Sequence, residues 1–274
     1  MPRQLRTEWA FDTSQFTPHQ FQARSFLSVS FNVMWNWMRT HFISFRRSIQ
    51  EHGLSWVIIR TEIDYHDRVG YFDADGFEAV IENVALRRNR MLEFHVEFRI
   101  PGKRIATGKI LLLAVKVGDQ DSLSALPGRV DDKLAILLSP DEIHPTVPAR
   151  VVPSILEKIQ QDGIPIAEGL YPFTVHRHLC EVADQWCFVE LAGLVGAGRE
   201  SLVTAHPSKS ADLLRGLSEP MKCLRAELRH AYFLFDQGRV ETTSYTLGER
   251  VYFVHRLLGG AVTQEPYATV IEEF

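Results

Sequence analysis

The chain has 274 residues, of which 45% are hydrophobic and 23% are charged, enough for one large globular domain or two of ordinary size. Its formal net charge of −4 argues against a protein that binds nucleic acid through a basic surface. The three cysteines have neither a zinc-like spacing nor the pattern of a disulfide framework, which favours a reducing, intracellular environment.

We expect neither a secretory leader nor a membrane span, and therefore a cytoplasmic protein. The N-terminal run MPRQLRTEW lacks the apolar region of a signal peptide. Residues 26–45 are long and apolar enough to suggest a transmembrane helix. Asn32, Asn36, Arg39 and His41 within that stretch favour a buried helix of a soluble protein instead.

A long helix is predicted over residues 26–49. Its first half, up to Met38, is apolar almost all round, whereas its second half is amphipathic, so the helix should be enclosed at its start and surface at its end. Residues 7–12 before it suit a short strand, residues 13–24 suit a polar loop, and Gly53 is a natural C-cap.

Four runs with strand periodicity follow the helix, over residues 55–65, 77–86, 91–100 and 105–117. Residues 119–169 read differently, because they hold six prolines and show little periodicity. We interpret them as a linker across the surface, with a short helix over residues 154–161 that begins in a Ser-x-x-Glu capping box.

The order of elements then repeats. A strand over residues 170–177 precedes a helix over residues 184–202, whose small residues suggest the close approach of a strand or a ligand. Four further strands are predicted over residues 223–233, 239–247, 250–258 and 267–272.

Local sequence echoes support a duplication. IRTEI at residues 59–63 matches LRAEL at residues 224–228, and RMLEF at residues 90–94 resembles RVYFV at residues 250–254. Two such halves are expected to join their sheets edge to edge about a pseudo-twofold axis, which would protect edge strands. The core is expected to contain the following side chains of the first helix: Phe31, Met34, Trp35, Met38 and Phe42.

The second half resembles a hotdog domain, in which a curled antiparallel sheet wraps a central helix. The resemblance lies in HRHLCEVADQWCFVELAGLVGAGRESLV (residues 176–203) and LRAELRHAYFLFDQGRVETTSYTLGERVYFVHRLL (residues 224–258), which look like the loop, helix and strands of acyl-thioester hydrolases of this superfamily. With the repeat, the chain is similar to double hotdog proteins. The resemblance implies an α+β fold with hotdog domains at residues 1–118 and 170–274, joined by a linker at residues 119–169.

Hotdog thioesterases carry an Asp, then a Gly-His-Asn-Asn-like run at the start of the helix, and an Arg near its end. In register these positions fall on Glu181, on Asp184 and Gln185, and on Arg199, so the histidine of the pattern is a glutamine here. The loop of the first half, with Thr-Pro-His at residues 17–19, is loosely similar to polyketide acyltransferase/decarboxylases.

The resemblance implies an enzyme that acts on an acyl group carried by coenzyme A or by an acyl-carrier protein, with no cofactor of its own. A thioesterase-like activity is the first reading, and a dehydratase or an acyltransferase/decarboxylase of a polyketide or fatty-acid pathway is an alternative. A hotdog protein that binds an acyl group without chemistry, or a scaffold with a filled tunnel, is the other alternative. A monomer or a homodimer of double hotdog chains is expected.

The catalytic candidates precede the two predicted helices. Glu181 and Asp184 lie at the start of the second helix, where a carboxylate could act as general base or nucleophile beside a helix N-terminus that polarises a carbonyl. Simple capping by Asp184 is the alternative. Asp12 and His19 occupy the matching place before the first helix, where either could be a base or part of a plain loop.

The substrate-binding candidates are more scattered. Arg90, in a cluster at residues 87–90, could attract the phosphates of coenzyme A or phosphopantetheine, or could lie in a solvated turn. Trp35 could line an acyl tunnel or pack in the core, and Arg199 comes from the resemblance. His178 shares a strand face with His176, where packing or hydrogen bonding is favoured over metal binding, so no metal site is expected.

Overall fold

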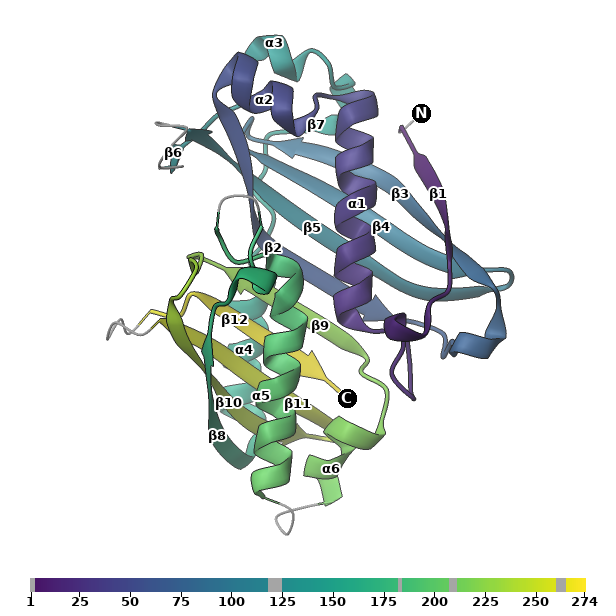
Figure 1. Cartoon of the computed structure of the whole chain (residues 1–274), viewed down its shortest axis with the longest axis vertical. Helices are drawn as coiled ribbons and strands as arrows, with labels where there is room; N and C mark the ends of the chain where they lie inside the picture. The colour runs from purple at the N-terminus through teal and green to yellow at the C-terminus, as the bar shows by residue number, and fades with distance from the viewer. Residues whose placement is uncertain (1–2, 118–124, 182–183, 207–210, 260–264) are drawn as a thin grey trace.

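Two helices, α1 (Ala23–His41) and α5 (Leu191–Ala205), lie on one face of a long antiparallel sheet that both halves of the chain share (Figure 1). The computed structural model describes residues 3–117, 125–181, 184–206, 211–259 and 265–274. None of the helices in these ranges is both long and apolar enough to cross a membrane.

The first half contains five main strands and two helices. Its strands are β1 (Leu5–Ala10), β2 (Leu54–Tyr65), β3 (Gly76–Arg87), β4 (Met91–Ile100) and β5 (Lys103–Val117). Beside α1 stand α2 (Phe45–His52) and two 3-10 turns, η1 (Thr13–Gln15) and η2 (Tyr71–Asp73).

The segment between the halves holds short elements and one longer helix. These are β6 (Ala125–Pro127), α3 (Asp132–Ala135), η3 (Pro140–Glu142), β7 (Ile143–His144) and α4 (Val151–Asp162). The helix α4 packs on the opposite face of the sheet from α5, because its Val152 and Ile159 form a separate apolar cluster with Tyr252, Val254 and Ile271.

The second half repeats the first. Its strands are β8 (Ile164–Thr174), β9 (Cys223–Leu228), β10 (Gln237–Leu247), β11 (Arg250–Gly259) and β12 (Ala268–Glu273). Around α5 lie η4 (Arg177–Leu179), η5 (Phe188–Glu190) and α6 (Ala211–Ser218). The sheet runs β1-β3-β4-β5-β2-β9-β12-β11-β10-β8. Counted from either edge towards the central β2–β9 pair, the strands of each half follow the same order. The predicted double hotdog architecture is confirmed.

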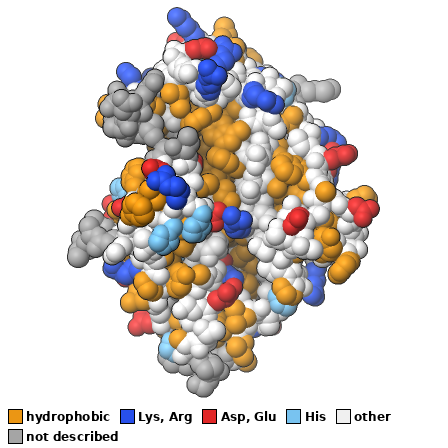
Figure 2. All heavy atoms as spheres, viewed as in Figure 1, with side chains coloured by type: hydrophobic (Ala, Val, Ile, Leu, Met, Phe, Trp, Pro, Cys, Tyr) orange, Lys and Arg blue, Asp and Glu red, His pale blue; other side chains and the backbone are white. Residues whose placement is uncertain are grey.

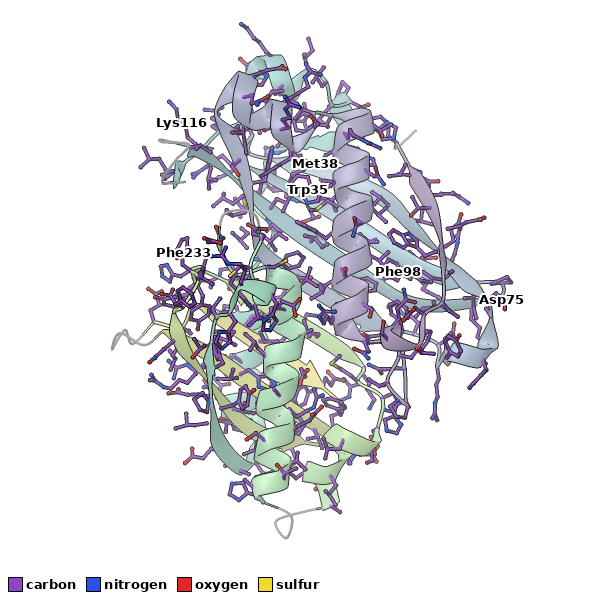
Figure 3. All side chains as sticks on the ribbon, in the orientation of Figure 1. Trp35, Met38, Asp75, Phe98, Lys116 and Phe233 are labelled. Atoms are coloured by element: carbon purple, nitrogen blue, oxygen red, sulfur yellow. The ribbon has the colours of Figure 1, made fainter. Side chains whose placement is uncertain are left out.

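The core lies between α1, α5 and the covered face of the sheet. Met34, Met38 and Phe42 are buried as predicted, but Trp35 and Phe31 are only half-buried. The fully enclosed tryptophan is Trp37, whose Nε1 donates to the carbonyl of Arg3 at 2.8 Å. In Figure 2 hydrophobic side chains gather along the flank of α1, on the side where Trp35 projects in Figure 3.

The prediction of one helix over residues 26–49 is wrong, because the helix is interrupted at residues 42–44, between α1 and α2. Phe42 leaves helical geometry, and the side chain of Ser44 accepts a hydrogen bond from the amide of Arg47 to start α2. The C-cap at Gly53 is confirmed, with a φ of 60° in the left-handed region.

Three other predicted boundaries are wrong. The second central helix begins at Leu191 rather than residue 184, because residues 185 and 186 pair in extended form with distant loops. The helix α4 begins at Val151, so Ser154 lies inside it, and its hydroxyl bonds the carbonyl of Arg150 instead of capping the helix. The strand β8 begins at Ile164, within the stretch interpreted as linker.

The halves join where β2 pairs with β9, and the echoed sequences meet there. The register places Arg60 opposite Glu227 and Glu62 opposite Arg225, about a central pair of Thr61 and Ala226. Arg60 Nη2 lies 3.7 Å from Glu227, and Arg225 Nε lies 3.9 Å from Glu62. The Arg-x-Glu motif of each half therefore contacts the same motif in the other half, which is the arrangement of an isologous interface.

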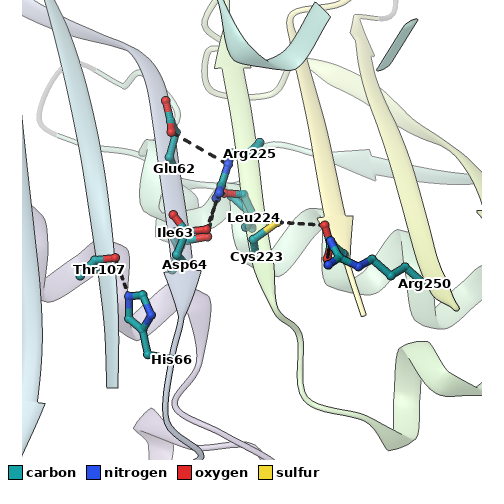
Figure 4. Close-up of polar contacts among 10 residues, drawn as sticks. Glu62, Ile63, Asp64, His66, Thr107, Cys223, Leu224, Arg225 and Arg250 are labelled. Carbon is teal, nitrogen blue, oxygen red and sulfur yellow. Dashed lines mark hydrogen bonds and ion pairs between the residues drawn. The ribbon is translucent and has the colours of Figure 1, made fainter. Parts of the chain in front are cut away.

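Further polar contacts support this junction. Arg225 also binds the carboxylate of Asp64, and its Nη1 donates to the carbonyl of Ile63 at 2.6 Å (Figure 4). Arg150, just before α4, binds Glu227 at 2.5 Å. The side chains of Arg225 and Glu62 are only 14% and 12% exposed, so their attraction is poorly screened by water.

We expect Trp37→Ala to lower the free energy of unfolding by about 3–5 kcal/mol, because it opens a cavity in a closed core. Trp35→Ala should cost only about 1–2 kcal/mol, since the side chain already contacts solvent. Urea denaturation of both variants measures the difference. Equal losses would contradict the burial described for the two residues.

We expect Arg225→Met to lower the free energy of unfolding by about 2–3 kcal/mol, because it leaves Glu62 half-buried without its partner. Arg46→Met is the matched control: Arg46 is exposed on α2 and, among the residues that the structure describes, its side chain bonds only Gln50, so its loss should cost less than about 0.5 kcal/mol. Denaturant melts of the two variants compare them directly. An Arg225 variant as stable as the control would show that the junction depends on its backbone bonds alone.

Candidate functional site

A cavity of about 420 Å³ opens where the two halves meet. The loop before α1 forms one wall, and α5 and α6 form the others with the C-terminal Phe274. It is lined by Thr17, Pro18, His19, Gln20, Gln22, Ala23, Arg24, Ala192, Gly193, Gly196, Ala197, Arg199, Glu200, Gly216, Leu217, Glu219, Met221, Glu272 and Phe274. Residues far apart in the sequence thus build one site.

The small residues of α5 divide between two roles. A Cβ on Gly198 would lie 3.0 Å from side chains of Val240 and Thr242, so this glycine allows the helix to approach β10 closely. A Cβ on Gly193 would meet nothing within 4 Å, and one on Gly196 would meet only Arg199, at 3.8 Å. The face of Gly193 and Gly196 is therefore open to the cavity.

The start of α1 reaches the same cavity without a side-chain cap. Gln22 occupies the N-cap position, but its Nε2 donates to the carbonyl of Phe16 at 2.9 Å and its side chain caps no amide. The first amides of a helix have no partner within it and carry partial positive charge. This end of α1 can therefore stabilise a negatively charged oxygen.

A tight turn before α1 positions His19. The amide of Thr17 donates to the carbonyl of Gln20, and the Thr17 hydroxyl accepts from the amides of His19 and Gln20. His19 is half-buried, which leaves part of its surface open to solvent and to the cavity that it lines. An imidazole in this position can exchange protons with a bound molecule.

An ion pair fixes the starts of the two central helices to each other. Arg24, in the first turn of α1, binds Glu190 at 2.6 and 3.0 Å through two of its nitrogens. Glu190 is the N-cap residue of α5. The carboxylate at the start of the second central helix is therefore Glu190, and not Asp184 as predicted.

A buried polar chain runs from the cavity into the sheet beneath α5. Arg199 binds the carboxylate of Glu272, whose Oε2 lies 3.2 Å from Nε2 of His255, and Nδ1 of His255 lies 2.9 Å from the hydroxyl of Thr242. Burial alone would raise the pKa of Glu272, but the Arg199 charge and the His255 hydrogen bond outweigh it and lower the pKa to about 2. Glu272 is thus a carboxylate that holds Arg199 at the cavity wall.

Two buried polar groups near Arg199 and Glu272 lack hydrogen-bond partners among the described residues. Nε of Arg199 and the hydroxyl of Tyr65 make no hydrogen bond to any part of the chain that the structure describes. Burial and the charge of Glu272 raise the pKa of Tyr65, so this phenol stays protonated. Both groups are donors that an acceptor entering this region could satisfy.

The structure brings only some of the predicted site residues together. His19 and Arg199 line the cavity. Asp12 is exposed, and hydrogen bonding to the side chain and then to the amide of Ser14 lowers its pKa. The bond from that amide, at 2.7 Å, makes Asp12 the cap of η1. Trp35 lies on the flank of α1, where its ring contacts Phe31 and Phe45 at 5.4 and 4.8 Å.

The predicted cluster before the second central helix lies apart from this cavity. Asp184 adopts a left-handed backbone with a φ of 53° and binds Arg177 at the surface. Glu181 is exposed overall, but the protein atoms around its carboxyl exclude water from it and thereby raise its pKa. His178 is exposed, with its ring 6.1 Å from that of His176. Neither carboxylate stands at the helix start, so the premise of that prediction is wrong.

Arg90 lies in a second cavity, of about 520 Å³, at the turn between β3 and β4. It is therefore part of a different surface from His19 and Arg199. In the ranges that the structure describes, no group of three or more His, Cys, Asp or Glu side chains is placed to hold a metal ion.

The sequence reasoning missed Glu272 and His255, although a signal was present. On β11 the inward residues Val251, Phe253 and Leu257 alternate with outward ones, and His255 falls on the inward face. Glu272 falls in the same way on β12. A titratable residue at an inward position of a buried strand requires a polar partner, and this could have identified both residues.

We expect the stabilising effect of Glu272 to depend on pH in one direction. Because its folded-state pKa of about 2 lies below the ordinary value of 4.5, its contribution is complete above pH 4.5 and is lost as the pH falls towards 2. Glu272→Gln should therefore be less stable than the unmodified protein at pH 7, and the gap should narrow below pH 4.5. Urea melts across this range measure the gap, with Glu157→Gln, at an exposed position of α4, as the control. A constant gap down to pH 2 would contradict the ion pair.

No protein-family model and no curated protein matches the sequence. The fold is nevertheless similar to solved structures over nearly the whole chain. A Lactobacillus plantarum protein described as an oleoyl thioesterase matches with a TM-score of 0.73 at 10% identity, over 99% of this chain and 96% of that chain. The 12:0-ACP thioesterase of Umbellularia californica matches with a TM-score of 0.71 at 11% identity, over 98% and 93%.

An acyl-ACP thioesterase of Bacteroides thetaiotaomicron matches with a TM-score of 0.67 at 8% identity, over 98% of this chain and 96% of that chain. At such identities the likeness concerns the fold, and each match extends through both halves and their junction. The chain therefore has the fold of double hotdog proteins, with two hotdog halves in one polypeptide.

Proposed function

We propose that this protein hydrolyses an acyl thioester in the cavity between its halves. One observation carries the proposal: the same cavity is lined by the uncapped start of α1 and His19 on one wall and by Arg199 of α5 on the other. A thioester carbonyl needs a positive group for its developing charge and a base for water, and these residues supply both. The full-length likeness to three proteins named as thioesterases supports the same reading.

The chemistry follows from these positions. His19 takes a proton from a water molecule as its oxygen adds to the carbonyl carbon, and the first amides of α1 stabilise the oxyanion. The carbon–sulfur bond then breaks, the acid is released, and the leaving thiolate receives the proton from His19. Glu272 and His255 hold Arg199 in place from beneath, so the guanidinium is a fixed positive charge beside the reacting group.

The aromatic flank of α1 is the proposed place for the acyl chain. Phe45, Trp35, Phe31 and Phe188 form a row in which neighbouring ring centroids lie 4.8 to 5.4 Å apart. Phe188 lies two residues before Glu190, whose partner Arg24 lines the cavity. Figure 2 shows hydrophobic surface along this flank. An apolar strip that begins near a polar cavity suits a long acyl group with a thioester at its end.

The carrier is proposed to be an acyl-carrier protein or coenzyme A. The Umbellularia californica and Bacteroides thetaiotaomicron proteins are named for acyl-ACP substrates, and the Lactobacillus plantarum protein for an oleoyl group. None of the three is named as a dehydratase or for a polyketide pathway. Mass spectrometry of the products distinguishes the three reactions. Hydrolysis releases free acid, dehydration lowers the mass of the acyl group by one water, and acyl transfer attaches the acyl group to the protein.

We expect the protein to release free acid from at least one member of a panel of medium- and long-chain acyl thioesters, and His19→Asn to lower kcat by about 10²-fold or more. His178→Asn is the matched control, because His178 is exposed outside the cavity and its loss should leave kcat unchanged. Glu181→Gln and Asp184→Asn test the alternative location. If these two variants are inactive while His19→Asn is fully active, the reaction lies beside Glu181 and Asp184 and not in this cavity.

Blocking the cavity supplies an independent arm of the same experiment. Gly193→Phe should abolish turnover, because a side chain there projects into open space at the cavity wall. Gly193→Ala should retain turnover and stabilise α5 slightly, since alanine is the better helix former by about 1 kcal/mol. Full activity of the folded phenylalanine variant would contradict the proposal, and so would the absence of both turnover and binding in the unmodified protein.

A further inference from the structure

The second cavity, of about 520 Å³, is distinct from the proposed reaction site. It is lined by Arg88, Asn89, Arg90, Arg129, Ile143, His144 and Pro145. The segment that carries β7 is tied to the end of α1, because Arg3 donates to the carbonyls of both His41 and Leu137. The first cavity lies at the other end of the same helix, which at 19 residues is about 28 Å long.

Hydrogen bonds hold three chain segments around this cavity. Arg88 and Asn89 form the turn between β3 and β4, both with a φ of 51°. The amide of Arg88 donates to the carbonyl of His144 at 2.9 Å, and Nε of Arg88 donates to the carbonyl of Pro145 at 3.2 Å. The amide of Val130 donates to the carbonyl of Asn89 at 2.7 Å. The turn is therefore fixed from two sides, and its arginines start from a rigid backbone.

The positive charge of this cavity is not neutralised by its surroundings. Arg90 and Arg129 make no ion pair or side-chain hydrogen bond within the described ranges of the chain. The nearby carboxylates are engaged elsewhere: Glu93 binds Arg87 and His95, and Glu142 binds Arg3. Three guanidinium groups and an imidazole thus share one hollow, and the described residues that line it include no acidic one.

We propose that this hollow binds a small molecule that carries a phosphate group. Guanidinium groups match phosphate oxygens in pairs, and several of them around one hollow favour a multiply charged anion over a single carboxylate. The volume exceeds the need of a phosphate alone, and Ile143 and Pro145 add an apolar wall for an attached organic group. The proposal does not rest on the reaction at the first cavity, because it concerns a separate set of residues.

Calorimetry on the full chain tests the site with four probes: inorganic phosphate, adenosine 5′-monophosphate, coenzyme A and dephospho-coenzyme A. We expect at least one to bind, and the affinity to fall by about tenfold or more in the Arg90→Ala/Arg129→Ala variant. The control is Arg46→Ala/Arg68→Ala, which removes the same charge from exposed positions outside the hollow and should leave the affinity unchanged. Circular dichroism verifies that both variants are folded.

The pattern among the probes identifies the source of the phosphate. Binding of inorganic phosphate alone points to the free ion, binding of all three organic probes points to a general phosphate ester, and a preference for coenzyme A over its dephospho form points to the ribose phosphate of that carrier. The proposal is overturned if no probe binds at millimolar concentration. It is equally overturned if the Arg90/Arg129 variant retains full affinity, or if the control loses as much.

Discussion

The pairing of β2 with β9 is the constraint on which the rest of the structure depends. It converts two five-stranded sheets into one, and it fixes how α1 and α5 lie relative to each other on the covered face. The cavity between the halves exists only because this register holds, since its walls come from the loop before α1 on one side and from α5, α6 and β12 on the other. A slip of one residue along β2 would turn every side chain of that strand to the opposite face.

The two faces of the β2–β9 junction carry different kinds of side chain. On the outer face, charged residues pair across the boundary and α4 covers part of the sheet. On the inner face, Thr61, Ile63, Leu224 and Ala226 are buried beneath the helices. The ion pair of Arg24 with Glu190 repeats the connection one layer above, between the helices themselves. The halves are thus joined at both the sheet and the helix layer, which keeps the walls of the cavity in a fixed relation.

Regular patterns in the sequence predicted the regular parts of the structure. The alternation over residues 91–100 gave β4 with its bounds, and the Arg-x-Glu echo marked the two strands that pair. Patterns failed where a contact distant in the sequence decides the conformation. Residues 185–189 look helical locally, but the amide of Trp186 donates to the carbonyl of Tyr232, and the helix begins only at Leu191. In a helix that is apolar all round, periodicity also cannot decide between Trp35 and Trp37.

The candidate site was predictable only in part, for a related reason. The place of His19 before a predicted central helix pointed to it, and the hotdog resemblance pointed to Arg199 within the second helix. Their meeting depends on the junction, which brings the loop of one half to the helix of the other. Glu272 ends the strand predicted over residues 267–272, and its role is defined by its partner Arg199 on the helix above it. The inward position of Glu272 on its strand signals a buried carboxylate, but its pairing with Arg199 follows only from the register of the strands.

The covalent link between the halves has a consequence at the pseudo-twofold axis. In a symmetric dimer of identical subunits, a residue on the axis meets itself, and every substitution appears twice. Here Thr61 meets Ala226, and the reciprocal Arg-x-Glu pairs persist on either side of them. The sequence of each half can therefore change independently. One cavity can acquire His19, Arg199 and Glu272 while the pseudo-symmetric position carries different residues. Dilution cannot separate the halves either, because one polypeptide holds both copies of the interface.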